Sequence, residues 1–128
     1  MEQIYIPPAY QRVMPYLIVK DASKFIAFAR TVFDATEKMM HRRPEGDIMH
    51  AELFIGDSVI MFADCSDQWG AMPAGLYVHV ANADETYSKA LQAGATSVME
   101  PSDQSYGRSG GVLDPCGNTW WIVTTEKN

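Results

Sequence analysis

The sequence has few of the residues that build disulfide frameworks, zinc sites or basic surfaces. It contains two cysteines and three histidines among 128 residues. Since no Cys-x-x-Cys pair occurs, the pattern argues against a disulfide scaffold and structural zinc. The net charge is −6, and the largest basic cluster is the pair at 42–43. This charge argues against nucleic acid or an anionic membrane surface as a partner.

Long apolar runs are also missing, so no segment is predicted to span a membrane. The first residues lack a basic region followed by an apolar one, and we therefore expect no signal peptide. Together with the low cysteine content, this favours a cytoplasmic protein with reduced thiols. Apolar residues make up 47% of the chain, which is enough for the core of one domain over residues 1–128.

Two halves of the chain resemble each other at a spacing of about 60 residues. YLIVKDA at 16–22 corresponds to YVHVANA at 77–83, and Gly-Asp-Ser at 56–58 corresponds to Gly-Asn-Thr at 117–119. Since one offset relates all of these landmarks, we interpret the chain as a duplication. Its modules are expected at about 11–64 and 75–125, with a linker at 65–74.

Each half is predicted to form a strand, a helix and three more strands, which is an α+β fold. Apolar residues on both faces of most strands indicate sheets that carry helices on one side and curve on the other. The expected strands are 12–19, 36–41, 47–55, 58–63, 76–81, 95–99, 108–113 and 118–124, the helices are 22–33 and 84–93, and residues 100–107 are expected to be a loop.

Three segments resemble a known superfamily. They are HAELFIGDSVIMFAD at 50–64, AGAT at 93–96 and YGRSGGVLDPCGNTWWIVTT at 106–125. The chain resembles the vicinal oxygen chelate superfamily of glyoxalases, bleomycin resistance proteins and dioxygenases, and is most similar to its PhnB-like and bleomycin-resistance-like members. The resemblance implies two tandem βαβββ modules that form a curved mixed sheet or half-barrel. It also implies a homodimer in which modules of two chains often complete each cavity.

Metal-dependent members of this superfamily hold the ion with His or Glu on the first and last strands of each module. Carried over to this sequence, those positions are Met14, Ile60, Gly75 and Trp121. None of them offers the oxygen or nitrogen donors that a hard divalent ion requires. We therefore predict that the family's metal centre and any other cofactor are missing. A divalent metal held by displaced ligands is the alternative.

Trp120 and Trp121 are adjacent on the last predicted strand, so their side chains should point to opposite faces. We expect Trp121 to face the cavity and Trp120 to face the helix. An indole in a cavity suits flat or apolar ligands. The alternative is that both indoles belong to the core or to an interface.

Other side chains that could contact a ligand are Tyr16, Tyr77, Tyr106 and Arg108. The guanidinium of Arg108 has a geometry suited to a carboxylate or phosphate, although a turn-stabilising role is equally compatible with its position. His50 and Glu52 share one strand face by their spacing and are candidates for a base and its orienting partner, or for a polar pair at an edge. His79 is a third candidate, with a hydrogen-bonded structural histidine as the alternative.

These patterns favour a small-molecule-binding protein of this superfamily whose partner is a small organic ligand. One alternative is a metal-dependent lyase, isomerase or dioxygenase that uses His50, Glu52 and His79 as displaced ligands. A second alternative is a metal-free enzyme with one of these histidines as general base and Arg108 holding an anionic substrate. The sequence leaves open whether a reaction is catalysed.

Overall fold

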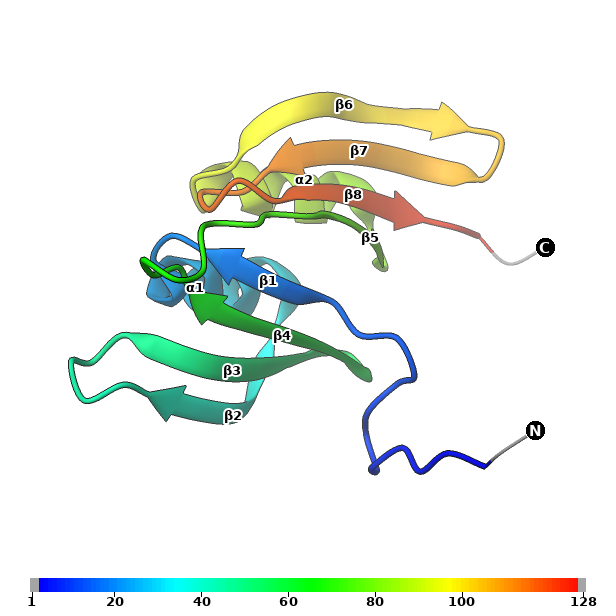
Figure 1. The fold of residues 1–128 in the computed structure, drawn as a ribbon. Coiled ribbons are helices and arrows are strands. Elements are labelled where there is room, and N and C mark those ends of the chain that lie inside the picture. Colours follow the sequence, from blue (N-terminus) through cyan, green and yellow to red (C-terminus); the bar gives the residue numbers. More distant parts are fainter. Residues whose placement is uncertain (1–2, 127–128) are drawn as a thin grey trace.

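The computed structural model describes residues 3–126, and within them the fold consists of two four-stranded sheets, each with one helix (Figure 1). The predicted order of strand, helix and three strands in each half is confirmed, as is the α+β class. The elements are β1 (Tyr16–Val19), α1 (Ala22–Phe33), β2 (Thr36–Arg42), β3 (Ile48–Ile55), β4 (Ser58–Asp64), β5 (Gly75–His79), α2 (Ala83–Gln92), β6 (Thr96–Gln104), β7 (Gly107–Leu113) and β8 (Thr119–Thr124). Neither helix in this range is long and apolar enough to cross a membrane.

The two halves have the same strand order. The first sheet is β1-β4-β3-β2 and the second is β5-β8-β7-β6. In each sheet the first strand runs parallel to the last strand of its module, and the other pairs are antiparallel. The linker follows the edge of β1, where Met72 and Ile18 exchange backbone hydrogen bonds. The sheets are mixed, as predicted, but they are separate and unclosed.

Helix α1 is fixed at its start by two aspartates. The side chain of Asp21 accepts a hydrogen bond from the backbone N–H of Lys24, which caps the helix. At the end of β4, the carboxylate of Asp64 accepts hydrogen bonds from the N–H groups of Ala22 at 2.6 Å and Ile48 at 2.7 Å. One carboxylate therefore joins the beginnings of α1 and β3 to β4.

The helices lie on one side of each sheet, and the helix-facing sides of both sheets share one core. The ring of Phe25 on α1 lies 4.8 Å from that of Phe62 on β4, and the ring of Phe33 lies 4.5 Å from that of Trp120 on β8. The core therefore crosses from one module to the other. We call the opposite side of each sheet, which carries no helix, its open face.

Trp120 is held in this core by a buried carboxylate in the turn before β8. Asp114 is 4% exposed, and its Oδ2 accepts hydrogen bonds from Trp120 Nε1 at 2.8 Å and Asn118 Nδ2 at 3.0 Å. Its Oδ1 accepts from the backbone N–H groups of Cys116 at 2.8 Å and Asn118 at 3.0 Å. These four bonds fix both the turn and the first residues of β8, so Trp120 points inward and Trp121 points to the open face.

The largest differences from the predicted boundaries are at the end of β6 and the start of β1. Residues 100–104 continue β6 and are not a loop; the strand passes through register shifts on both sides of Met99, and Pro101 lies within the second. Proline is compatible with an edge strand at such an irregularity, so it did not end the strand. At the other end of the chain, β1 begins at Tyr16 rather than at residue 12.

Replacing Asp114 with alanine should lower the free energy of unfolding by about 3 kcal/mol, because the indole N–H and the Asn118 amide lose a charged acceptor inside the core. Chemical denaturation measures this loss. The matched control is Asp57→Ala at the exposed turn of the first module, which should change stability by less than about 0.5 kcal/mol. Equal stability of the two variants would contradict the anchoring role of Asp114.

Candidate functional site

The open face of the first sheet carries a row of polar and apolar side chains set by the strand register. Tyr16 on β1 lies opposite Met61 on β4, and Met61 lies opposite Glu52 on β3. His50 is two residues before Glu52 and therefore shares its face. The predicted pairing of His50 and Glu52 is thus present in the structure: His50 Nε2 lies 2.7 Å from Glu52 Oε2.

Hydrogen bonds extend this pair in both directions. The hydroxyl of Tyr16 lies 3.0 Å from His50 Nδ1. On the other side, the hydroxyl of Tyr10 donates to Glu52 Oε1 at 2.5 Å, and Lys38 Nζ donates to the Tyr10 hydroxyl at 2.9 Å. We call Tyr10, Tyr16, Lys38, His50 and Glu52 the Glu52 network.

Glu52 is the buried member of this network. It is 2% exposed. Burial alone would raise the pKa of its carboxyl, but hydrogen bonds from Tyr10 and His50, with the charges of His50 and Lys38, bring that pKa below its ordinary value. The ionised carboxylate only accepts hydrogen bonds, so the proton between it and His50 belongs to Nε2. In a neutral imidazole Nδ1 is then an acceptor, and the hydroxyl of Tyr16 donates to it.

Tyr10 joins the N-terminal segment to this site. Its ring lies under the ammonium group of Lys38, 4.1 Å from the ring centroid. Sequence reasoning missed both residues, because Tyr10 precedes the repeated unit and Lys38 lies at a register shift in β2. Neither position follows the strand alternation from which the candidate residues were selected.

The open face of the second sheet is aromatic. Tyr77 on β5 lies opposite Trp121 on β8, and Tyr77 is 54% exposed. The rings of Tyr77 and His79 are 5.3 Å apart. Trp121 is half-buried and faces this side, opposite the helix-facing Trp120 as predicted, whereas a cavity at Trp121 stays a prediction.

Gly111 on β7 makes room for the indole of Trp121. A Cβ atom at this position would lie 2.7 Å from Trp121 Cζ3 and 2.8 Å from Cε3. The ring therefore lies across the backbone of the neighbouring strand. The sequence showed the glycine but gave no sign that it serves the tryptophan.

The metal positions carried over from the superfamily do not fit a divalent ion. The structure also corrects one of them, because Ile60 is 6% exposed and lies on the helix-facing side. In the second module Trp121 is paired with Tyr77, and the equivalent partner of Tyr16 in the first module is Met61. Gly56 and Gly117 each lie two residues before the next strand, but Tyr16 is paired with Met61 and Tyr77 with Trp121. A count of four from the turn glycine therefore reaches the open face in the second module and the helix-facing side in the first. The corrected position, Met61, offers a thioether sulfur, which a hard cation does not prefer as a ligand.

The alternative ligand set is not assembled within the chain. His50 and Glu52 are on the first sheet and His79 is on the second. Among residues 3–126, no three His, Cys, Asp or Glu side chains are grouped so that they could hold a metal ion.

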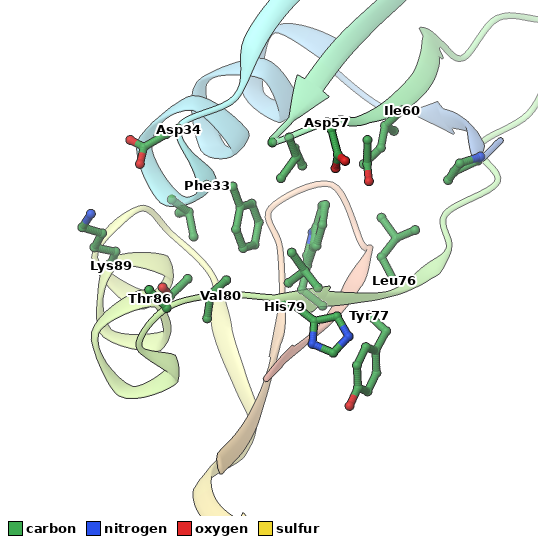
Figure 2. Close-up of a pocket in the computed structure, with 18 of the residues that line it drawn as sticks. Phe33, Asp34, Asp57, Ile60, Leu76, Tyr77, His79, Val80, Thr86 and Lys89 are labelled. Atoms are coloured by element: carbon green, nitrogen blue, oxygen red, sulfur yellow. The ribbon is translucent and has the colours of Figure 1, made fainter. Parts of the chain in front are cut away.

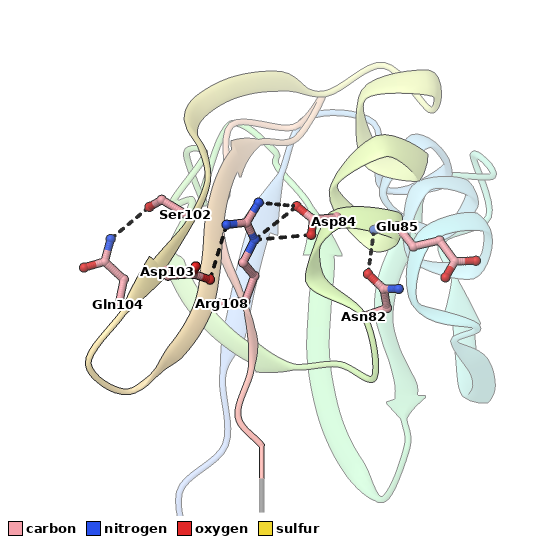
Figure 3. A network of polar contacts seen from close by, with 7 residues as sticks. All are labelled: Asn82, Asp84, Glu85, Ser102, Asp103, Gln104 and Arg108. Atoms are coloured by element: carbon pink, nitrogen blue, oxygen red, sulfur yellow. Dashed lines mark hydrogen bonds and ion pairs between the residues drawn. The ribbon is translucent and has the colours of Figure 1, made fainter.

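Arg108 does not face the open side. The alternation of β7 directs it toward α2, where its guanidinium donates to Asp84 at 3.2–3.4 Å and to Asp103 at 3.3 Å (Figure 3). The hydrogen bonds to these carboxylates, chiefly to Asp84, raise the pKa of Arg108 above its ordinary value. Tyr106 is 48% exposed in the turn between β6 and β7. The structure therefore does not group these two residues with Trp121.

A cavity of about 700 Å³ lies on the other side of β5, between this strand, the β3–β4 turn and the end of α1 (Figure 2). Phe33, Ile60, Leu76 and Trp120 line it, and Tyr77 and His79 of β5 also contribute to its lining. Figure 2 shows Tyr77 and His79 directed away from Phe33 and Ile60. The cavity is thus a groove between the modules, and it is separate from the Glu52 network.

Replacing Glu52 with glutamine should lower the free energy of unfolding at neutral pH by about 2 kcal/mol, because His50, Tyr10 and Lys38 lose a charged acceptor. The folded-state pKa of Glu52 is lowered. Its stabilisation is therefore present above the unfolded pKa of about 4.3 and is lost as the pH falls through the folded-state value. Unfolding measured from pH 7 down into the acid range should show a smaller acid-dependent loss in the variant.

The control for this measurement is Glu37→Gln, which removes an exposed carboxylate that faces Arg30 across 3.6 Å. Such surface pairs contribute about 0–1 kcal/mol. If Glu52→Gln and Glu37→Gln have the same free energy of unfolding at pH 7 and lose the same stability in acid, Glu52 has no special stabilising role.

Comparisons with known proteins agree with this architecture. A family model described as the Glyoxalase/Bleomycin resistance protein/Dioxygenase superfamily matches residues 10–122. An uncharacterised protein of Mycobacterium bovis, Mb0911c, is 34% identical over 91% of this chain and 83% of its own length.

Two solved structures show the same fold at lower identity. The PhnB protein of Bacillus cereus has a TM-score of 0.69 and 18% identity, over 90% of this chain and 100% of its own. TnmS3 of Streptomyces sp. CB03234, described as an antibiotic binding protein, has a TM-score of 0.70 and 14% identity, over 91% of this chain and 100% of its own. The match over residues 10–122, the two sheets of identical strand order and the 34% identity to Mb0911c establish that this chain belongs to the glyoxalase/bleomycin resistance protein/dioxygenase superfamily.

Proposed function

We propose that the protein binds a small, flat organic molecule on its open faces and does so without a divalent metal. The observation that carries this proposal is the position of Trp121, an indole laid across Gly111 on a face that also exposes Tyr77 and His79. Stacking against such a surface and removal of water from it favour a flat or apolar ligand. At the positions where metal-dependent members of the superfamily hold the ion, this chain has side chains that do not ligate a divalent metal. This favours binding of the organic ligand without an ion.

The polar counterpart of this aromatic surface is the Glu52 network on the other sheet. Tyr16 is 46% exposed, so its hydroxyl is accessible to a ligand while Glu52 remains buried. A ligand that contacts both surfaces would meet an indole on one side and a hydrogen-bonding phenol on the other. The description of TnmS3 as an antibiotic binding protein supports a binding role for this fold.

We further propose that the chain is a homodimer in which the open face of one chain's first sheet meets the open face of the partner's second sheet. Within one chain, His79 does not join His50 and Glu52. Exposed apolar side chains on both faces, including Tyr16 at 46%, Tyr77 at 54% and Leu113 at 39%, favour cover by a second copy. A cup assembled in this way would hold the ligand between the two surfaces.

A flat aromatic ligand should quench tryptophan fluorescence saturably in the presence of a chelator. Trp121→Phe should remove most of the quenching and weaken binding about two- to tenfold, since aromatic contacts contribute roughly 0.5–1.5 kcal/mol. The control is Trp69→Phe, which alters an exposed indole in the linker and should leave the affinity unchanged. Quenching that requires added metal, or that Trp121→Phe leaves intact, would count against the proposal.

The homodimer is tested by light scattering during size exclusion, which should give twice the mass of one chain. Tyr77→Glu should shift the distribution toward monomer, because it places a charge in the proposed contact. Tyr5→Glu, at a position that is 81% exposed in the N-terminal segment, should not. A monomeric mass for the unmodified protein over the whole concentration range would exclude this arrangement.

A further inference from the structure

We infer that the ligand of this site carries an acidic hydroxyl group, a phenol or an enol, and that Tyr16, His50 and Glu52 form a relay that takes up its proton on binding. This inference rests on the proposed function and names the class of ligand. It is independent of the metal chemistry of the superfamily, since only side chains of this chain take part.

The relay is continuous from the surface to a buried charge. It begins at the hydroxyl of Tyr16, which is 46% exposed, and passes through 3.0 Å to His50 Nδ1 and through 2.7 Å from Nε2 to Glu52. Both ring nitrogens of His50 are engaged, so the imidazole is held in one orientation. This is the arrangement that lets a histidine exchange a proton at one nitrogen while a carboxylate stabilises the charged ring.

Each proton in the transfer has a defined destination. The O–H bond of the ligand breaks and its proton goes to the oxygen of Tyr16, while the proton of Tyr16 goes to His50 Nδ1. The electron pair of the broken bond stays on the ligand oxygen, which becomes an anion. Tyr16 then donates a hydrogen bond to this anion, and the new imidazolium is paired with Glu52.

The charged and titratable groups around His50 come from its own strand and from β2. Glu52 provides the carboxylate on the same strand. From β2, Lys38 lies 3.5 Å from Glu52 Oε1 and His41 is the cross-strand neighbour of His50. Tyr10 donates to the far oxygen of Glu52 and so leaves Oε2 for the histidine.

The carboxylate of Glu52 cannot itself reach a ligand, because it is 2% exposed and both its oxygens accept hydrogen bonds. Asp114 differs, because its side-chain partners Trp120 and Asn118 are both buried and its hydrogen bonds do not lead to an exposed side chain. From Glu52 the chain of hydrogen bonds ends in a phenol at the surface. This difference is what points to exchange with a bound molecule.

The experiment uses two probes of the same shape, 4-nitrophenol and 4-nitroanisole, and only the first can ionise. Binding of each is measured with the full-length protein, and ionisation of bound 4-nitrophenol is followed through the visible absorbance of the phenolate. The bound probe should ionise about one pH unit below the free probe, which corresponds to a tenfold preference for the anion. Tyr16→Phe and His50→Gln should each abolish this shift, and binding of 4-nitroanisole to each variant, measured in parallel, shows that the site is still occupied.

The control is Tyr5→Phe, which removes a tyrosine hydroxyl from an exposed position outside the site and should preserve the shift. If 4-nitroanisole binds but bound 4-nitrophenol ionises at the pH of the free probe, the relay is refuted and the proposed function stands. A shift that survives both Tyr16→Phe and His50→Gln also refutes it. If neither probe binds but another aromatic ligand without a hydroxyl group does, the assigned ligand class is wrong. If no aromatic ligand binds at all, the proposed function fails as well.

Discussion

The buried hydrogen bond between the Trp120 indole and Asp114 constrains the rest of the second module. Asp114 accepts four hydrogen bonds in the turn before β8, and the position of Trp120 in the shared core follows from them. Strand alternation then leaves Trp121 on the other side. An indole on an open face is costly unless something covers it, so the same constraint that completes the core also creates a surface suited to a ligand or a partner.

Two buried carboxylates in this chain show how similar chemistry can serve different purposes. Asp114 is surrounded by donors that are themselves buried or part of its own turn, and its network is closed. Glu52 is equally buried, but its hydrogen bonds lead through His50 to Tyr16 at the surface and through Tyr10 to the N-terminal segment. Because the Glu52 network ends at the exposed hydroxyl of Tyr16, it can contact a bound ligand, whereas the Asp114 network cannot.

Much of the fold could be predicted from the sequence because it depends on periodicity. The apolar stripe of α1 and the repeated strand-to-helix segments gave the element order, and adjacency in sequence was sufficient to separate Trp120 from Trp121. The predictions were wrong where the strand pairing did not follow a constant spacing along the sequence. A fixed count from the turn glycine assigned Ile60 to the cavity, although it lies on the helix-facing side, and β6 continues past Pro101 through a stretch that looked like a loop.

The site was predictable only in part for the same reason. His50 and Glu52 could be paired because their spacing places them on one strand face, whereas Tyr10 comes from outside the repeat and reaches Glu52 across 42 positions. Arg108 was a candidate ligand-binding residue at the start of a predicted strand, but the alternation of that strand directs it to Asp84 and away from the open face (Figure 3). Contacts of this kind depend on tertiary structure and leave no local pattern.

The central claim is that the open face bearing Trp121 is where a ligand binds. The most direct measurement is a nuclear magnetic resonance titration that follows the indole N–H resonances of Trp69, Trp120 and Trp121 as a flat aromatic ligand is added. Binding on the open face should give a saturable shift of the Trp121 resonance, with the resonances of buried Trp120 and linker Trp69 nearly unchanged. A ligand that binds and shifts Trp120 or Trp69 while leaving Trp121 in place would contradict it.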